Sequence, residues 1–173
     1  ILDLFGVWPN LVRTPTLPPV GMEAELVYGG DGSLLEGKPV AGTIALLDYS
    51  SGSAWIDAFE LGVRAVVLLG AQEGHRREAE QKFLAVPADL PRLYAPAPTA
   101  SRLRQLEGAH VRLRGRMDWR SARAQNIVVV IEGADPDLKD EAVYLSAHYD
   151  AISPVPALAP GAEQALSAAA LLE

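Results

Sequence analysis

The residues best suited to metal chemistry are His148 and Asp150, which stand two positions apart in the last third of the sequence. An imidazole nitrogen is a common zinc ligand. A carboxylate on the other ring N–H fixes the tautomer and raises the basicity of the ring. The same pair also arises by chance, as a surface histidine beside an acid. Because an apolar run precedes it, the pair is expected at the end of a strand. The chemistry that it could support is zinc binding.

A second candidate site is basic. Arg112, Arg114 and Arg116 alternate with apolar residues, which places the three guanidinium groups on one face of an expected strand. Such a row could bind an anionic partner or a substrate carboxylate. The alternative is a solvated surface on which the arginines pair with Glu or Asp of a neighbouring strand.

Composition limits the function classes. The chain has 173 residues, 49% of them apolar, and its 15 basic and 22 acidic residues give a net charge of −7. An acidic chain is poorly suited to nucleic acid, and no apolar run approaches the roughly 20 residues of a membrane-spanning helix. The absence of cysteine excludes thiol catalysis, disulfides and cysteine-based zinc fingers. No nucleophile elbow, phosphate-binding loop or dinucleotide fingerprint is present.

The sequence predicts a βαβ unit over residues 42–70 as part of the framework that would position the candidate site residues. Residues 43–48 form an apolar, partly β-branched run typical of a buried strand, and residues 64–69 form a second. Between them, serines at 50–53 offer turn and N-cap chemistry, and Gly62 stands where a left-handed residue ends a helix. So short a crossover predicts two parallel strands.

The other expected elements are less regular. Residues 1–40 are rich in Pro and Gly, which predicts one short strand near residues 24–28 and otherwise irregular structure. Further along we expect helices over residues 75–84 and from Thr99 to Gly108, and strands over 90–94, 110–118, 126–131 and 142–146. A helix is expected over residues 163–173.

Residues 35–122 resemble a protease-associated (PA) domain. The resemblance is carried by residues 36–42 (EGKPVAG) leading into a strand, by residues 58–69 (AFELGVRAVVLL) and by residues 90–94 (LPRLY), in the order and at the spacing of that family. It implies a mostly β domain with short helices that restricts access to an active site or holds a partner.

Residues 126–173 resemble the opening of a two-zinc exopeptidase domain of the zinc aminopeptidase family. The matches are residues 126–133 (NIVVVIEG), 146–150 (SAHYD), 160–162 (PGA) and 168–173 (AAALLE). The resemblance implies that His148 is a zinc ligand and that Asp150 holds its ring. The family's bridging aspartate falls on Gln164, a neutral amide that cannot hold two dications together. Glu163, one residue away, could substitute only with a changed backbone path.

The resemblances together predict an α/β (α+β) chain in three parts. These are a Pro/Gly-rich segment over residues 1–34, a PA-like domain over 35–122 and an incomplete zinc-exopeptidase-like domain over 123–173. The chain begins at Ile1 and ends inside an expected helix, which predicts a piece of a longer protein. The family's other zinc ligands and its general base lie beyond the matched part. The chain itself is therefore expected to lack catalysis, catalytic residues and a bound cofactor, and zinc is expected only if a longer form keeps the family site.

Two functions remain open. The chain belongs either to a zinc-exopeptidase-like protein or to a non-catalytic module of a pseudo-peptidase, in which the PA-like domain recognises a peptide or protein. A third alternative is a sugar- or peptide-binding fragment unrelated to proteolysis. Family members with a PA domain are mostly exported, which implies a periplasmic or extracellular location. Because three peptidase-like elements cannot cover both faces of a sheet, apolar surface should stay exposed. The chain is then expected either to form a homodimer or to pack these strands against residues 1–40.

Overall fold

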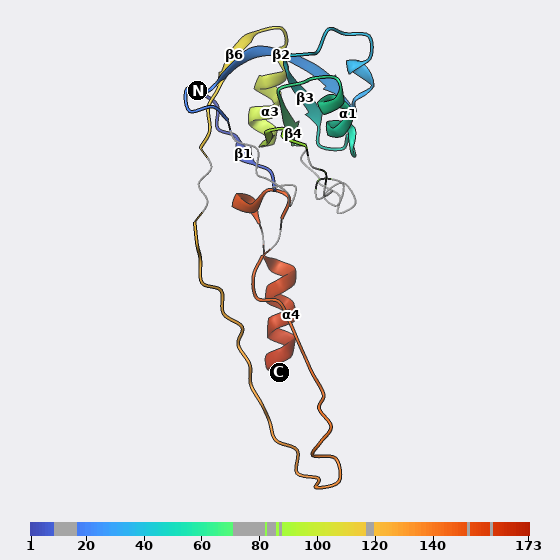
Figure 1. Ribbon diagram of the computed structural model, residues 1–173, viewed down its shortest axis with the longest axis vertical. Coiled ribbons are helices and arrows are strands. Elements are labelled where there is room, and N and C mark those ends of the chain that lie inside the picture. The colour runs from blue at the N-terminus through green and yellow to red at the C-terminus, as the bar shows by residue number, and fades with distance from the viewer. Residues whose placement is uncertain are drawn as a thin grey trace. The chain divides into compact units, whose positions relative to one another are not determined.

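Parallel strands form the centre of a six-stranded sheet (Figure 1). Strands β2 (Met22–Gly30), β3 (Ile44–Asp48), β4 (Ala65–Leu69) and β5 (Arg92–Ala95) pair in parallel, each with the next. The apolar runs of β3 and β4 are buried along almost their whole length, as expected of strands that are covered on both faces.

Antiparallel strands extend the sheet at both edges, giving the order β1-β5-β4-β3-β2-β6. β1 (Phe5–Gly6) pairs with β5, and β6 (His110–Leu113) pairs with β2. The two edge strands thus come from the first and the last parts of the sheet's sequence.

This computed structural model describes residues 1–8, 17–70, 82, 86, 88–116, 120–151, 153–159 and 161–173. The chain divides into two compact units. The sheet unit comprises Ile1–Met117 with Ile152–Pro160, and the tail unit comprises Asp118–Ala151 with Gly161–Glu173. Almost all of the helix expected over residues 75–84 lies outside the described residues. None of the described helices is long and apolar enough to cross a membrane.

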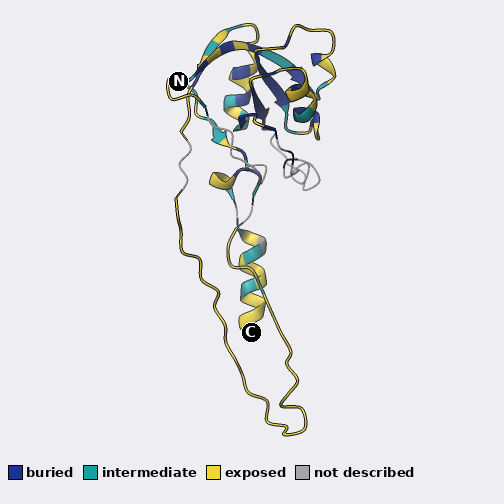
Figure 2. Cartoon of the chain, in the orientation of Figure 1, coloured by how far each residue is buried: buried dark blue, intermediate teal, exposed yellow. Residues whose placement is uncertain are grey.

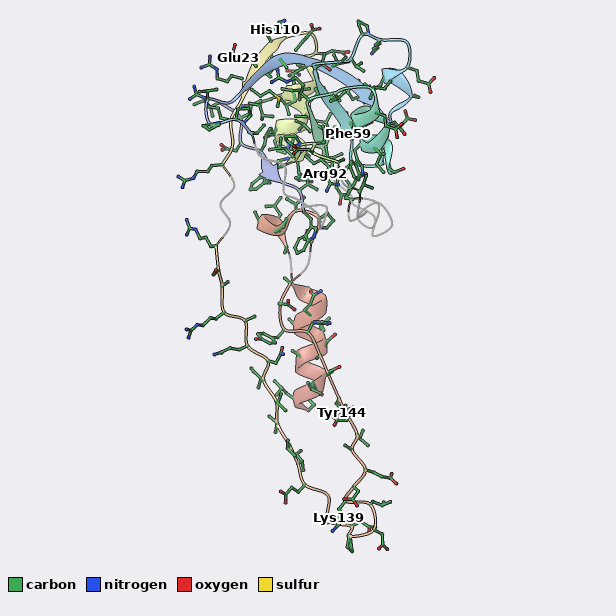
Figure 3. All side chains as sticks on the ribbon, viewed as in Figure 1. Glu23, Phe59, Arg92, His110, Lys139 and Tyr144 are labelled. Atoms are coloured by element: carbon green, nitrogen blue, oxygen red, sulfur yellow. The ribbon has the colours of Figure 1, made fainter. Side chains whose placement is uncertain are left out.

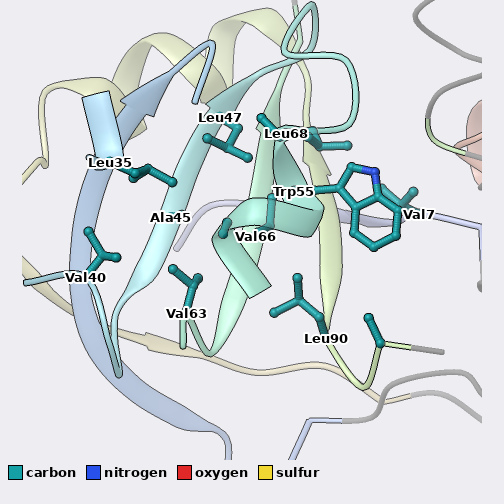
Figure 4. Packing of buried hydrophobic residues seen from close by; sticks show 13 residues of the cluster. Val7, Leu35, Val40, Ala45, Leu47, Trp55, Val63, Val66, Leu68 and Leu90 are labelled. Atoms are coloured by element: carbon teal, nitrogen blue, oxygen red, sulfur yellow. The ribbon is translucent and has the colours of Figure 1, made fainter. Parts of the chain in front are cut away.

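Helix α1 (Ala54–Glu60) covers one face of the sheet (Figure 4). Its Trp55 is fully buried among alternate residues of β3 and β4, including Leu47 and Leu68. Ser53 is the N-cap residue, as expected, although its side chain makes no capping hydrogen bond. Gly62 adopts the expected left-handed conformation (φ 81°), and its N–H donates to the carbonyl of Phe59, which ends the helix.

Helix α3 (Ala97–Arg104) lies on the other face of the sheet. Its Ala100 and Leu103 pack with the remaining alternate positions of β3 and β4, such as Leu46 and Val67. Because side chains alternate along each strand, β3 and β4 contribute to two separate apolar clusters, one on each face of the sheet. The helix begins before the expected Thr99, because prolines are tolerated in a first turn, where their missing N–H has no intrahelical partner.

The sheet unit confirms the expected α+β class and the βαβ unit. The structure adds β1 and the short 3-10 helix η1 (Ser33–Leu35), neither of which was expected, and β2 is longer than its Gly-rich sequence indicates. Strand β6 ends at Leu113 rather than near residue 118. A second 3-10 helix, η2 (Pro156–Leu158), also belongs to the sheet unit.

The prediction of strands over residues 126–131 and 142–146 is wrong. Both segments of the tail unit are extended, but neither pairs with a described strand. Their side chains are open to solvent: Ile127–Ile131 are 78–91% exposed, and Tyr144 is 90% exposed (Figure 2). An apolar run makes a buried strand only where partner strands and a covering layer are present. Helix α4 (Ala162–Leu172) forms as expected.

Candidate functional site

The expected metal pair lies in the tail unit. His148 Nδ1 and Asp150 Oδ1 are 3.6 Å apart, and the two side chains are 85% and 71% exposed. At this separation the atoms form an ion pair only when the imidazole is protonated, and the distance is too long for a hydrogen bond between the two side chains. The structure therefore brings the two residues together, as their spacing predicts, on an exposed part of the tail unit.

The two residues at the expected bridging position lie in the first turn of α4. Gln164 is partly buried, and its backbone belongs to the helix. The side chain of Glu163 is outside the described part of the structure. The loop before the helix reaches it through Gly161, whose φ of 70° is a left-handed conformation.

The donor set does not fit a catalytic zinc ion. Such a site needs three protein ligands and an open position. The described residues contain no group of three or more His, Asp or Glu side chains placed to hold a metal ion. Of the expected site residues, His148 offers one imidazole nitrogen, and Gln164 offers an uncharged amide that supplies no bridging charge.

A groove in the sheet unit is a second candidate site, and sequence reasoning missed it. The hollow of about 910 Å³ lies over the face of the sheet that α3 partly covers, beside β6 and the first residues of the chain. Its walls are mostly apolar and include Leu2, Leu4, Leu17, Leu93, Leu103, Leu106, Val111 and Leu113. The lining comes from segments more than a hundred residues apart, so no local pattern could reveal it.

The row of arginines borders this groove. In the antiparallel register, Arg112 lies opposite Glu23, and its guanidinium donates to that carboxylate. Figure 3 labels Glu23 and His110 at this edge of the sheet. Both ion-pair partners are more than half exposed, so the pair adds at most about 1 kcal/mol. The expectation that an arginine of this row pairs with an acid on a neighbouring strand is confirmed for Arg112.

A polar cluster stands where β3 ends. The hydroxyl of Tyr28 donates to Asp48, with O–O distances of 3.0 and 3.2 Å, and Arg104 of α3 forms an ion pair with the same carboxylate. Desolvation raises the pKa of Tyr28, and the hydrogen bond to Asp48 raises it further. The cluster ties α3 to the sheet, and every side chain in it is engaged.

A buried cation ties three segments of the sheet unit together. Arg92 is 7% exposed, and its guanidinium donates to the carbonyls of Trp8 (2.8 Å) and Lys82 (3.1 Å). Its Cζ lies 4.1 Å from the centre of the Trp55 ring. Burial lowers the pKa of Arg92 to about 10. Two backbone carbonyls thus accept hydrogen bonds from this buried guanidinium, which Figure 3 labels in the sheet unit.

Comparisons with known proteins give one distant neighbour. No family model matches the chain, and no curated protein matches it. Among solved structures, an aminopeptidase from Aneurinibacillus sp. strain AM-1 is similar over 57% of this chain, with a TM-score of 0.39 and 20% identity. The matched part is 26% of the length of that aminopeptidase. A structural neighbour of this chain is therefore an aminopeptidase.

Proposed function

We propose that the chain is the partner-binding part of a zinc-exopeptidase-like protein. In this proposal residues 35–122 act as a PA-like domain that, together with the N-terminal residues of the sheet unit, binds a peptide or a protein. Residues 123–173 begin a peptidase-like domain that does not hydrolyse peptides by itself. We further propose that the protein is exported and that it does not bind nucleic acid. It binds zinc only if a longer form keeps the family's metal site. It rests on the order of the sequence resemblances and on the groove.

The observation that carries the proposal is the groove of about 910 Å³ in the sheet unit. Ligand sites are typically concave, mostly apolar and bordered by a few polar groups. Here apolar side chains from α3, β6 and residues 1–4 form the walls, and Arg112, Arg114 and Arg116 form part of the border. This combination suits a segment of polypeptide that has apolar side chains.

A peptide array tests this binding function. The whole chain is incubated with an array of ten-residue peptides of varied sequence and compared with a Val111→Arg variant, which places a charge in the groove. Leu34→Arg is the matched control, because Leu34 is 47% exposed and lies outside the lining. We expect wild type and Leu34→Arg to retain a common set of peptides and Val111→Arg to lose it. Circular dichroism checks that all three chains are folded. An array without bound peptides, or one unchanged by Val111→Arg, would contradict the proposal.

The second candidate function is catalysis, and the closeness of His148 and Asp150 favours it. Zinc titration by calorimetry, together with hydrolysis of an aminoacyl p-nitroanilide, separates the two functions. We expect no stoichiometric zinc and no hydrolysis in this chain, and a gain of zinc on Gln164→Asp in a longer form of the protein. If this chain instead binds one equivalent of zinc and the His148→Ala variant does not, the result would support the catalytic function.

A further inference from the structure

An open strand edge borders the groove. β6 is the last strand in the order of the described sheet, so one of its edges pairs with β2 and the other has no strand beside it in the described residues. Such an edge presents N–H and C=O groups that can pair with another extended chain.

The composition of the lining shows that this edge faces the groove. Val111 and Leu113 point inward, because they lie opposite the buried Ala24 and Met22 of β2. Arg112 is exposed and points to the other face of the sheet. Both sets of residues line the hollow, together with Arg114 and the residues that follow it. A wall to which both faces of one strand contribute is the edge of that strand.

The outer face beside this edge carries alternating charge from strand to strand. β2 places Glu23 and Glu25 outward, and β6 places Arg112 and His110 opposite them. Arg114 follows in the same alternation, and it is exposed without an ion pair to a described residue. A second hollow is lined by Arg64, Arg112 and Arg114 with Glu23 as its acid, which leaves net positive charge there. The strand that best continues this pattern is acidic on its outer face.

We propose that the free edge of β6 binds an extended peptide segment in which apolar and acidic residues alternate. The peptide adds to the sheet as one more strand, and its backbone pairs with that of residues 110–116. Because side chains alternate across a strand, every second residue enters the groove beside Val111 and Leu113, and the residues between them face Arg114. The inference rests on the proposed function, since it names the partner of the groove that the sheet unit is proposed to use.

Fluorescence anisotropy of labelled peptides tests the proposal on the whole chain. The probe is a ten-residue peptide of alternating Glu and Val, with blocked ends. A Lys/Val peptide of the same length is its charge control. We expect the Glu/Val peptide to bind at least about tenfold more tightly, because like charges opposite each other destabilise paired strands. Arg114→Glu should weaken its binding about fivefold. Arg102→Glu, an exposed arginine of α3 outside the lining, should change the binding less than twofold.

Backbone methylation separates strand addition from simple charge attraction. In an extended peptide, successive N–H groups point to opposite edges. One peptide methylated on every Val nitrogen and another on every Glu nitrogen therefore remove donors from opposite edges. We expect one of the two to lose binding more than tenfold and the other to retain it.

Several results would overturn the inference. These are equal binding of the Lys/Val peptide, no effect of Arg114→Glu, or the same affinity for both methylated peptides. A dimer in sedimentation that Arg114→Glu disrupts, while no peptide binds, would assign the edge to a second copy instead. If the array finds peptides that depend on Val111 but lack alternating acids, the proposed binding function stands and this inference fails.

Discussion

At Arg92 one side chain joins the N-terminal segment, β5 and the region of residue 82. The pKa of Arg92 is lowered to about 10 because burial disfavours its charge. An unfolded chain keeps this guanidinium protonated to a higher pH, so above about pH 10 the unfolded state binds more protons than the folded state. Rising pH in that window therefore relieves the cost of burying the charge. At neutral pH the fold bears this cost, which the two carbonyl hydrogen bonds and the Trp55 ring offset.

Replacing this residue should destabilise the sheet unit. We expect Arg92→Met to lower the free energy of unfolding by about 2 kcal/mol, because the carbonyls of Trp8 and Lys82 lose a charged donor that methionine cannot replace. The matched control, Arg102→Met on the exposed surface of α3, should stay within about 0.5 kcal/mol of wild type. Urea unfolding at pH 7 measures both. Equal stability of the two variants would mean that the buried guanidinium contributes nothing net.

At the scale of an element, α1 is a short helix whose stability comes from what it covers. Seven residues are too few for a helix to persist alone in water. Its Trp55 is fully buried, whereas Phe59 on the same helix is 37% exposed. Burial of the Trp55 ring therefore holds α1, the connection between β3 and β4, against the sheet.

The two aromatic residues of α1 offer a matched pair of variants. Trp55→Ala should cost about 3–5 kcal/mol, because it removes a large side chain from the centre of a packed cluster. Phe59→Ala should cost about 1 kcal/mol or less, because much of that ring already meets water. Thermal or urea unfolding gives both values. If Phe59→Ala proved the more damaging, the described packing of α1 would be incorrect.

Elements with strong local signals were the predictable part of the fold. An apolar run, a cap and Gly62 define β3, α1 and β4 within thirty residues of sequence. β1 has two residues and depends on a partner nearly ninety positions away, so no window of sequence reveals it. For residues 126–131 the error is the opposite, since a strand was predicted that the structure does not contain. Composition shows that a segment favours a strand, but it does not show whether partner strands are present.

The candidate sites likewise differ in how far local sequence could predict them. The closeness of His148 and Asp150 follows from a spacing of two along one segment. The groove could not be predicted, because Leu2 and Leu113 meet only after the sheet has formed. The pairing of Arg112 lies between these cases: period two gives the face on which the arginine points, but only the register supplies Glu23.

At the scale of the whole molecule, the tail unit exposes more apolar surface than a monomer ordinarily tolerates. Residues 127–131 and 143–145 include no side chain less than 77% exposed (Figure 2). Contiguous apolar surface of this kind marks an interface. The expected uncovered apolar surface is present, and the homodimer expected to cover it stays a prediction.

Self-association tests that prediction. We expect the chain to sediment as a dimer or larger species at tens of micromolar, and Val129→Lys with Tyr144→Lys to shift it toward the monomer, because charges on an extended segment oppose edge pairing. Lys139, in the turn between the two segments, gives the control: Lys139→Glu changes charge outside them and should leave the association unchanged. A monomer at all concentrations would contradict the expectation.

The order of strands also governs how the protein can fold. β2 meets β3 across a short stretch of chain, but its other edge must wait for β6, and the Glu23–Arg112 contact spans 89 positions. Closing so long a loop costs entropy before any pairing rewards it, which slows the search for the native topology. During synthesis on a ribosome, β2 therefore remains a half-paired strand until about ninety further residues have emerged. Over that interval the free edge of β2 is open to pairing with other chains, which a chaperone would prevent.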